Sequence, residues 1–456
     1  MASVILDRKR KKRLEQGQPW IYANEIASVD GEYEPGDLVS VLSHTGQYLA
    51  TGYINPKSQI AVRVVSYTPL EQMDRDFFAS RFEQCAQLRS RFVGEATGYR
   101  LVYGEADFLP GLVVDRFADV LVIQVLSLGM ERCKPLIVET LAELFQPRGI
   151  YERSDVSVRE LEGLEQIKGP LYGDCPRYVE IVENGLRIEV DIEQGQKTGY
   201  FLDQRENRAS IHKLMTGWGA RSGIRLATDE STGRSVPVNA NGKEVTFPYW
   251  DGASVLECFS HTGSFTLNAC SGGAKKVTCL DISEHAVDTA RRNVERNGFT
   301  DRVEFVVADA FDYLRAQVRG LEERRARAQA GQGSGAGKVD TSKPVGAEGR
   351  TWDVVILDPP AFAKTKGAVP GALRGYKDIN LHAMKLVNEG GYLVTASCSY
   401  HVRPDVFLET ILSAASDARK VLRQIEYRGA GKDHPQLLGT SEGDYLKFAI
   451  FEVRSR

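Results

Sequence analysis

The sequence places a thiol and a carboxylate at the ends of two predicted strands. Cys398 follows the strand predicted over residues 391–397, and Asp358 ends the strand predicted over 352–358. In a parallel α/β sheet these ends meet at one edge, so both side chains are expected there. A thiolate that adds to C6 of a pyrimidine makes C5 able to take a methyl group. Cys398 therefore fits the nucleophile of a pyrimidine methyltransferase, with Asp358 holding the base.

Each of these residues also has a structural explanation. Asp358 precedes Pro359 and Pro360, which force an extended exit from the strand and could form a purely structural turn. If Asp358 is to assist the addition by donating a proton to N3, burial must raise its pKa. A cysteine can simply fill a core, and this is expected of the other six cysteines, which show no CxxC pair or metal-ligand spacing. No metal is predicted.

A cofactor site is predicted beside this pair. The strand expected over 254–258 ends in Phe259-Ser260-His261-Thr262-Gly263, a small polar turn that opens a helix. The next strand ends at Asp281, which lies 281 − 257 = 24 residues after Glu257 and suits a carboxylate that binds a ribose diol. Asp309 ends the third strand and could meet an adenine amino group. These acids suggest a nucleoside-bearing cofactor, while the absence of GxGxxG disfavours the nicotinamide alternative.

The elements that position these residues alternate between strand and helix after about residue 181. Strands are expected over 254–258, 276–281, 303–308, 352–358 and 391–397. This alternation predicts a doubly wound, mostly parallel sheet. Two segments interrupt it: residues 219–250 read as an inserted hairpin, and residues 321–350 read as a helix extension followed by a flexible loop.

The first part of the chain has a different texture. Short alternating runs between residues 17 and 66, separated by turn formers, predict a small β-barrel. A helical pattern, two strands and another helix then predict a central α+β module. We therefore expect an α/β protein with three domains, at 1–68, 69–180 and 181–456, the last of them Rossmann-like.

Composition narrows the protein class. Of 456 residues, 42% are hydrophobic and 26% charged, which is typical of a globular protein. No apolar stretch reaches the roughly 20 residues of a membrane span, and the N-terminus has no signal peptide pattern, so a cytoplasmic location is predicted. Since the net charge is only −3, RNA binding would need a local patch. The six cations of residues 8–13 could meet phosphate, or form a solvated or frayed terminus.

The complete set of motifs resembles the bacterial 23S ribosomal RNA cytosine-5 methyltransferases that carry an N-terminal PUA domain. The resemblance spans nearly the whole chain. The matching segments are GQPWIYANEI, EPGDLVSVLS, EADFLPGLVVDRF, QKTGYFLDQRENR, ECFSHTGSFT, LDIS, DPPAFAKTK, ASCSYHV and DHPQLLGTSEGDYLK.

This resemblance implies S-adenosyl-L-methionine as cofactor, large-subunit ribosomal RNA as partner and an RNA-binding barrel at the N-terminus. It makes Cys398 the nucleophile. It puts five residues around the cofactor and target base, namely Phe259, Gly263, Asp281, Asp309 and Asp358. In the same way Gln204 and Arg205 would close the pocket, although their segment could also be a helix start with charged surface residues.

Several alternatives stay open at this point. Thiolate addition serves uracil as well as cytosine, and only the resemblance selects cytosine. A related branch methylates guanine at N7 but lacks the motif cysteine, and a non-catalytic RNA-binding protein of ribosome assembly would bind without methyl transfer. The motif at the end of the fourth strand lacks the second cysteine that another group of RNA cytosine-5 enzymes uses to release product, so some other base must remove the C5 proton. None of Lys364, Lys366 and His401 is assigned to that role. A homodimer is compatible with the sequence.

Overall fold

The fold is described from a computed structural model, which describes residues 1–221, 223–245, 252–330, 345–440 and 443–456. Contacts divide the chain into two compact units, each treated by itself. The N-terminal unit holds residues 1–205 and 430–443, and the C-terminal unit holds residues 206–429 and 444–456. The three-domain division at residues 68 and 180 stays a prediction.

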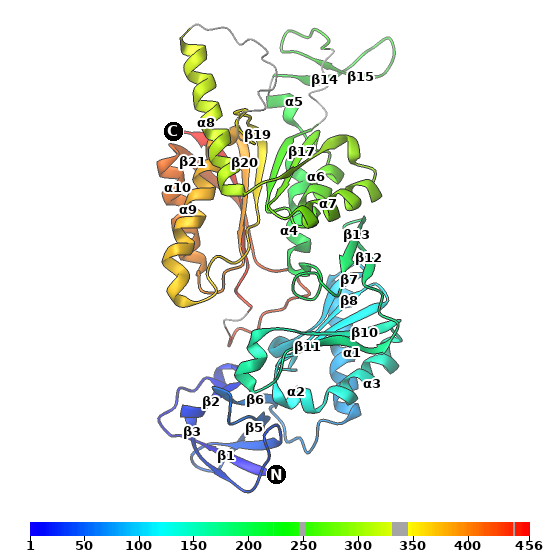
Figure 1. The fold of residues 1–456 in the computed structure, drawn as a ribbon, viewed down its shortest axis with the longest axis vertical. Coiled ribbons are helices and arrows are strands. Elements are labelled where there is room, and N and C mark those ends of the chain that lie inside the picture. The colour runs from blue at the N-terminus through cyan, green and yellow to red at the C-terminus, as the bar shows by residue number, and fades with distance from the viewer. Residues whose placement is uncertain (222, 246–251, 331–344, 441–442) are drawn as a thin grey trace. The chain divides into compact units, whose positions relative to one another are not determined.

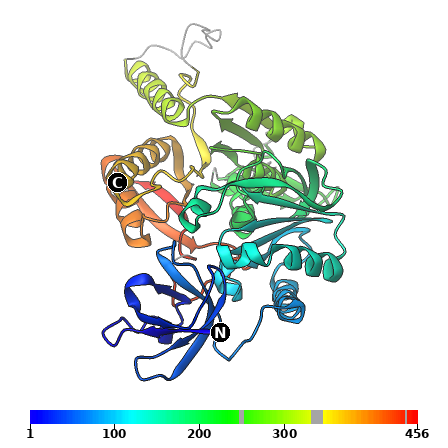
Figure 2. The ribbon, with the colours of Figure 1, turned by 60° about the horizontal axis from the view of Figure 1, so that its bottom comes forward.

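The first 66 residues form a six-stranded sheet around its own apolar core (Figure 2). Its order is β2-β6-β5-β4-β1-β3. The strands are β1 (Ala2–Leu6), β2 (Trp20–Tyr22), β3 (Ile26–Asp30), β4 (Leu38–Leu42), β5 (Tyr48–Ile54) and β6 (Ile60–Ser66). The alternating pattern predicts that this sheet begins near residue 17. Strand β1 belongs to it as well, because it pairs with both β3 and β4 and buries Val4.

A five-stranded sheet follows, in the order β11-β10-β9-β8-β7. Its strands are β7 (Gly98–Tyr103), β8 (Leu112–Phe117), β9 (Val120–Val125), β10 (Gly149–Ser154) and β11 (Ile167–Gly173). The helices of this region are α1 (Arg75–Phe92), α2 (Leu128–Arg132) and α3 (Lys134–Phe145). Asp74 caps α1 by accepting the Phe77 N–H, and the helix buries Phe78 and Phe82 against the sheet. A hairpin of β12 (Tyr178–Glu183) and β13 (Leu186–Asp191) comes next.

The C-terminal unit is built on a seven-stranded sheet in the order β18-β17-β16-β19-β20-β22-β21. The first five of these strands are parallel, β22 pairs antiparallel with β20, and β21 pairs antiparallel with β22. The bounds are β16 (Ser254–Cys258), β17 (Lys276–Asp281), β18 (Val303–Val307), β19 (Trp352–Leu357), β20 (Val387–Ser397), β21 (Lys420–Arg428) and β22 (Lys447–Ser455). The predicted doubly wound sheet is confirmed.

Helices cover both faces of this sheet (Figure 1). The helices in this part of the chain are α4 (Arg205–Ser210), α5 (Trp218–Arg221), α6 (Ser264–Ser271), α7 (Glu284–Arg296), α8 (Ala310–Gln329), α9 (Val369–Leu386) and α10 (Pro404–Asp417). Because side chains alternate along a strand, β19 serves two cores. Val354 and Ile356 pack with α6, whereas Val355 and Leu357 pack with α8, α9 and α10. This double burial fixes the register at which the strand ends meet.

Both predicted insertions are partly described. Strands β14 (Arg225–Thr228) and β15 (Ser235–Val238) form the hairpin expected in the first insertion. Helix α8 runs to Gln329 and accounts for the expected helix extension in the second. The flexible loop predicted after it falls largely on residues 331–344, which lie outside the described residues. Within the described parts of the chain, no helix has the length and apolar character needed to cross a membrane.

Candidate active site

Cys398 directly follows β20, the strand that lies between β19 and β22 in the sheet. Its side chain is half-buried, and its Sγ lies 3.8 Å from the main-chain oxygen of Pro359, toward which the thiol donates. Pro359 immediately follows Asp358, which itself follows the last residue of β19. The structure thus brings the cysteine and the Asp-Pro-Pro motif together at one edge of the sheet, as the sequence predicts.

The main chain on both sides of Cys398 is held by buried hydroxyl groups. The Tyr376 hydroxyl, from α9, lies 2.9 Å from the hydroxyls of both Ser397 and Ser399. Ser399 Oγ also accepts the Ala363 N–H at 3.2 Å, which ties the cysteine loop to the segment after the two prolines. Since these groups are buried, each hydrogen bond restricts the loop, and the thiol is presented from a fixed backbone.

A buried lysine lies on the other side of the same loop. Lys447 begins β22 and pairs with Ser397 across the sheet. Its Nζ donates to the main-chain oxygens of Ser399 and Tyr445, both at 2.7 Å. Burial lowers the pKa of Lys447 to about 8, while the charges of Cys398 and Asp444 act to raise it. The ammonium is therefore electrostatically coupled to the cysteine.

Three acidic side chains, those of Glu257, Asp281 and Asp358, gather where β16, β17 and β19 end. Burial raises the pKa of Glu257 to about 8; hydrogen bonds from Thr266 act to lower it, and the charges of Asp358 and Asp281 act to raise it further. The Glu257 carboxylate accepts the Thr266 N–H at 2.7 Å and also binds the Thr266 hydroxyl. It therefore fastens the start of α6 to the end of β16.

The turn between β16 and α6 has an unusual backbone. Phe259 and His261 have φ values of 63° and 48°, in the left-handed region that favours glycine and is uncommon for other residues. Gly263 follows with φ 76°, and a Cβ at this position would lie 2.9 Å from the Cβ of Ala290 in α7. Gly263 is therefore required both by its backbone conformation and by the close approach of α7.

Asp281 ends β17 and faces this turn. Its Oδ2 accepts the His261 N–H, and its Oδ1 accepts the Ser283 N–H, both at 2.9 Å. Burial lowers the pKa of His261 to about 4 even though the Asp281 charge opposes that shift, so the imidazole is neutral near pH 7. The carboxylate is thus oriented by two main-chain donors.

Asp309 differs from the expectation that it ends a strand. Strand β18 stops at Val307, and Asp309 is the residue before α8, where its side chain accepts the Asp312 N–H. The ring of Phe311, two residues further, lies 6.4 Å from that of Phe259 and 5.8 Å from that of Phe362. These rings bring the segments after β16, β18 and β19 together.

Gln204 and Arg205 belong to the N-terminal unit, and both are buried. Arg205 Nη1 forms an ion pair with Asp433 at 3.2 Å. Burial acts to raise the pKa of Asp433, but the charges of His434 and Arg205 and the Arg100 N–H hold it at about 2. Arg205 does begin helix α4, but its side chain is buried, so it is not a charged surface residue. Its predicted role at the cofactor pocket, and that of Gln204, stay predictions.

Four residues near this edge were not singled out from the sequence as site residues. Glu257 and Lys447 are described above, and the buried Arg208 acts electrostatically on His261. Ile282 follows Asp281 and is 67% exposed, which gives the strand end an apolar surface. For Glu257 and Ile282 a signal existed, because both lie directly within a strand-end motif. A single lysine or arginine carries no such signal.

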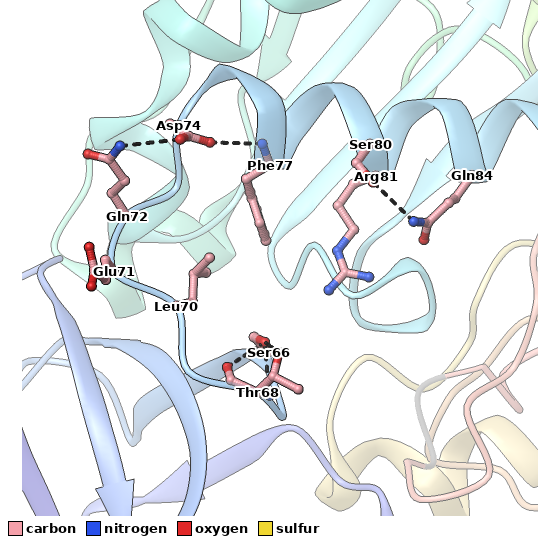
Figure 3. A pocket seen from close by; sticks show the side chains of 10 residues that line it. All are labelled: Ser66, Thr68, Leu70, Glu71, Gln72, Asp74, Phe77, Ser80, Arg81 and Gln84. Carbon is pink, nitrogen blue, oxygen red and sulfur yellow. Dashed lines mark hydrogen bonds between the residues drawn. The ribbon is translucent and has the colours of Figure 1, made fainter.

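A separate hollow lies in the N-terminal unit and is lined by none of the predicted site residues (Figure 3). It has a volume of about 500 Å³ and lies between α1 and the segment that precedes it. Arg81 reaches from α1 to the Val65 carbonyl oxygen at 3.2 Å, and its guanidinium lies over the rings of Phe77 and Phe108. The Arg81 guanidinium, packed on these two rings, therefore forms part of the lining of the hollow.

Comparisons with known proteins agree with this architecture. Residues 4–67 match a PUA-like domain, and residues 226–324 match the family described as conserved hypothetical protein 95. The chain is 39% identical to ribosomal RNA large subunit methyltransferase I of Pseudoalteromonas translucida, over 99% of both chains. It is 38% identical to the protein of that name from Shewanella denitrificans, over 97% of both chains.

Two solved structures share the fold over the full length. One is a protein from Streptococcus mutans assigned as a SAM-dependent methyltransferase, with a TM-score of 0.70 at 19% identity. The other is an assigned methyltransferase solved in complex with SAH, with a TM-score of 0.72 at 19% identity. Each alignment covers 99% of this chain and 100% of the other. At this level of identity the likeness shows the fold.

Proposed function

The chain belongs to the family of ribosomal RNA large subunit methyltransferase I proteins, and from that membership we propose that it methylates C5 of a cytosine in large-subunit ribosomal RNA. S-adenosyl-L-methionine supplies the methyl group when it is bound. The observation that carries the choice of C5 is Cys398, whose thiol points to the Pro359 carbonyl oxygen at the sheet edge where the carboxylates gather.

The residues at this edge suit the cofactor. Asp281 has an oriented carboxylate that can accept hydrogen bonds from a ribose diol, and the exposed Ile282 can pack on a flat apolar ring. The buried hydroxyl of Thr262 makes no hydrogen bond within the described part of the chain, so it is available to a ligand. Phe259, Gly263 and Asp309 would complete the site.

The protein's own groups would activate the base. Cys398 adds as a thiolate to C6, and the electron pair displaced toward C5 makes that carbon nucleophilic. Asp358 would hold the Watson–Crick edge of the cytosine. After methyl transfer, a base removes the C5 proton and the thiolate leaves from C6, which restores the aromatic ring.

RNA contact is assigned to the PUA-like region. In residues 8–13, Arg10 is paired with Glu15 at 2.6 Å, and Arg13 stacks over Tyr22. The other four cations of the segment are exposed and free to meet phosphate. This supports a phosphate contact over a frayed terminus. The substrate and the family also favour a cytoplasmic location.

The test is transfer of a labelled methyl group to unmodified large-subunit ribosomal RNA, followed by identification of the nucleoside. Native protein should form 5-methylcytidine, and Cys398→Ala should form none while it still binds the cofactor. Cys175→Ala is a matched control, because Cys175 is also partly buried but lies in the N-terminal unit. Methylated uridine or guanosine, or full activity of Cys398→Ala, would overturn the proposal.

An RNA that contains 5-fluorocytidine separates the covalent step from binding. Since fluorine cannot leave as a proton, the C6 adduct should accumulate as a stable complex with native protein. Cys398→Ala should give no such complex. Methyl transfer without any trapped complex would argue for a mechanism without the thiolate.

A further inference from the structure

We propose that Lys447 is a positioning residue for Cys398, holding the loop that carries the thiol and favouring its thiolate form. This inference rests on the proposed role of Cys398 as nucleophile. It adds a residue from the last strand of the chain to the predicted site.

Lys447 holds the loop that carries Cys398 through a hydrogen bond. The Lys447 side chain is fully buried, and its Nζ binds the carbonyl oxygen of Ser399, the residue directly after Cys398, at 2.7 Å. A second bond of 2.7 Å to the Tyr445 carbonyl oxygen fixes the ammonium itself. Ser399 is thus held through its carbonyl by Lys447 and through its hydroxyl by Tyr376. The loop cannot shift without breaking buried hydrogen bonds.

Lys447 carries a buried charge at a position where an apolar side chain would also fit. Burying an ammonium is strongly unfavourable unless a countercharge is near. The residues that follow in β22, Phe448, Ala449 and Ile450, are buried and apolar, so a packed apolar side chain would suit the strand. Among the described residues, no carboxylate forms an ion pair with Lys447. The acidic groups that act on it are the Cys398 thiol and Asp444.

The coupling must act in both directions. A thiolate at Cys398 stabilises the Lys447 ammonium, so the ammonium stabilises the thiolate to the same extent. The pKa of Lys447, at about 8, leaves most molecules charged near pH 7. Two further ionisable groups in the described part of the chain lie near this loop: Tyr376 on α9, whose pKa is raised by burial, and Asp358, which directly precedes Pro359. Both are acids, so neither of the two carries a positive charge.

The experiment measures the thiolate directly in the full-length protein. The rate of Cys398 alkylation by iodoacetamide is followed against pH, with the modified peptide identified by mass spectrometry. Lys447→Gln keeps an N–H donor but removes the charge, and it should raise the alkylation midpoint by about one to three pH units. Lys447→Arg should restore the native midpoint. The kcat of Lys447→Gln should be low near pH 7 and recover toward alkaline pH, with KM for RNA unchanged.

Tyr376→Phe is the matched control, because it removes hydrogen bonds to the same loop without removing a positive charge. It should lower kcat and leave the alkylation midpoint in place. Lys447→Met removes both the charge and the N–H donor. Cofactor binding checks that each variant is folded. An unchanged midpoint in both neutral variants, or an equal shift in Tyr376→Phe, would overturn the proposal. Methyl transfer that survives in Cys398→Ala would instead refute the proposed function.

Discussion

The Asp281 carboxylate accepts the main-chain N–H of His261 at 2.9 Å, which links the ends of the neighbouring strands β16 and β17. His261 lies in the strained turn, with φ 48°. The same carboxylate that is predicted to bind the cofactor therefore also supports the turn that would surround it. We therefore expect cofactor binding and local structure to be coupled at this residue.

Asp281→Asn should weaken cofactor binding by about 10- to 100-fold, because a hydrogen bond to a charged group contributes about 1.5–3 kcal/mol. The remaining amide oxygen can still accept one main-chain N–H, so the fold should be kept. Calorimetric titration with S-adenosylhomocysteine measures the change. Asp312→Asn, whose side chain is 82% exposed at the start of α8, serves as control. If the two variants bind S-adenosylhomocysteine with equal affinity, Asp281 does not belong to the cofactor site.

Gly263→Ala should destabilise the start of α6 by more than its backbone strain alone. Its Cβ would lie 2.9 Å from the Ala290 Cβ, whereas a Cβ at Gly298, with φ 73°, would meet nothing within 4 Å. We expect about 1 kcal/mol of strain in Gly298→Ala and a further 1–3 kcal/mol from overpacking in Gly263→Ala. Hydrogen exchange of peptides from α6 and α7 measures both. Similar exchange in the two variants would contradict the packing argument.

Glu257 should make stability depend on pH. Its pKa is raised from 4.5 to about 8 by burial, so the folded state binds a proton that the unfolded state releases. The stabilisation from this group is full below pH 4.5 and is lost as the pH rises toward 8. Glu257→Gln should therefore unfold at a more nearly constant temperature between pH 5 and 8. A pH profile that is the same in both proteins would show that Glu257 stays ionised.

Arg205→Ala should destabilise the N-terminal unit by about 3–5 kcal/mol, because Asp433 would keep a buried charge without this partner. Arg187→Ala is the matched control: it breaks an ion pair of 2.7 Å with Glu180 in which both side chains are well exposed, and should cost at most about 1 kcal/mol. Hydrogen exchange within residues 98–205 measures both variants. Equal effects would mean that the Asp433 pair adds no stability.

The strands of the sheet could be predicted closely from sequence. The bounds 254–258 and 276–281 are confirmed, because apolar runs there are closed by polar turns. β20 begins at Val387, four residues before the prediction, since Gly390 and Gly391 resemble a turn although the strand already pairs with Trp352. A bulge shifts the register of β19 and β20 between Trp352 and Val354. The periodicity of the sequence does not reveal this bulge.

The candidate site was predictable where motifs end strands, and less so elsewhere. The neighbourhood of Cys398 and Pro359 follows from parallel pairing of β19 and β20. Lys447 could not be found in this way, because its position in an apolar strand predicts a buried side chain and its charge predicts an exposed one. Asp309 is predicted to end a strand but caps helix α8, because a helix cap and a strand end look alike in sequence.

The chain leaves the C-terminal unit after β21 and returns to it before β22, and residues 430–443 between them belong to the N-terminal unit. Within that segment the Asp433 carboxylate forms an ion pair with Arg205, and the Asp433 carbonyl oxygen accepts a hydrogen bond from Arg89. Arg89 also forms an ion pair with Asp107. During synthesis these partners emerge from the ribosome more than two hundred residues after Arg205. The N-terminal unit therefore completes its buried charge network only when translation is almost finished, and truncation after residue 205 cannot isolate it intact.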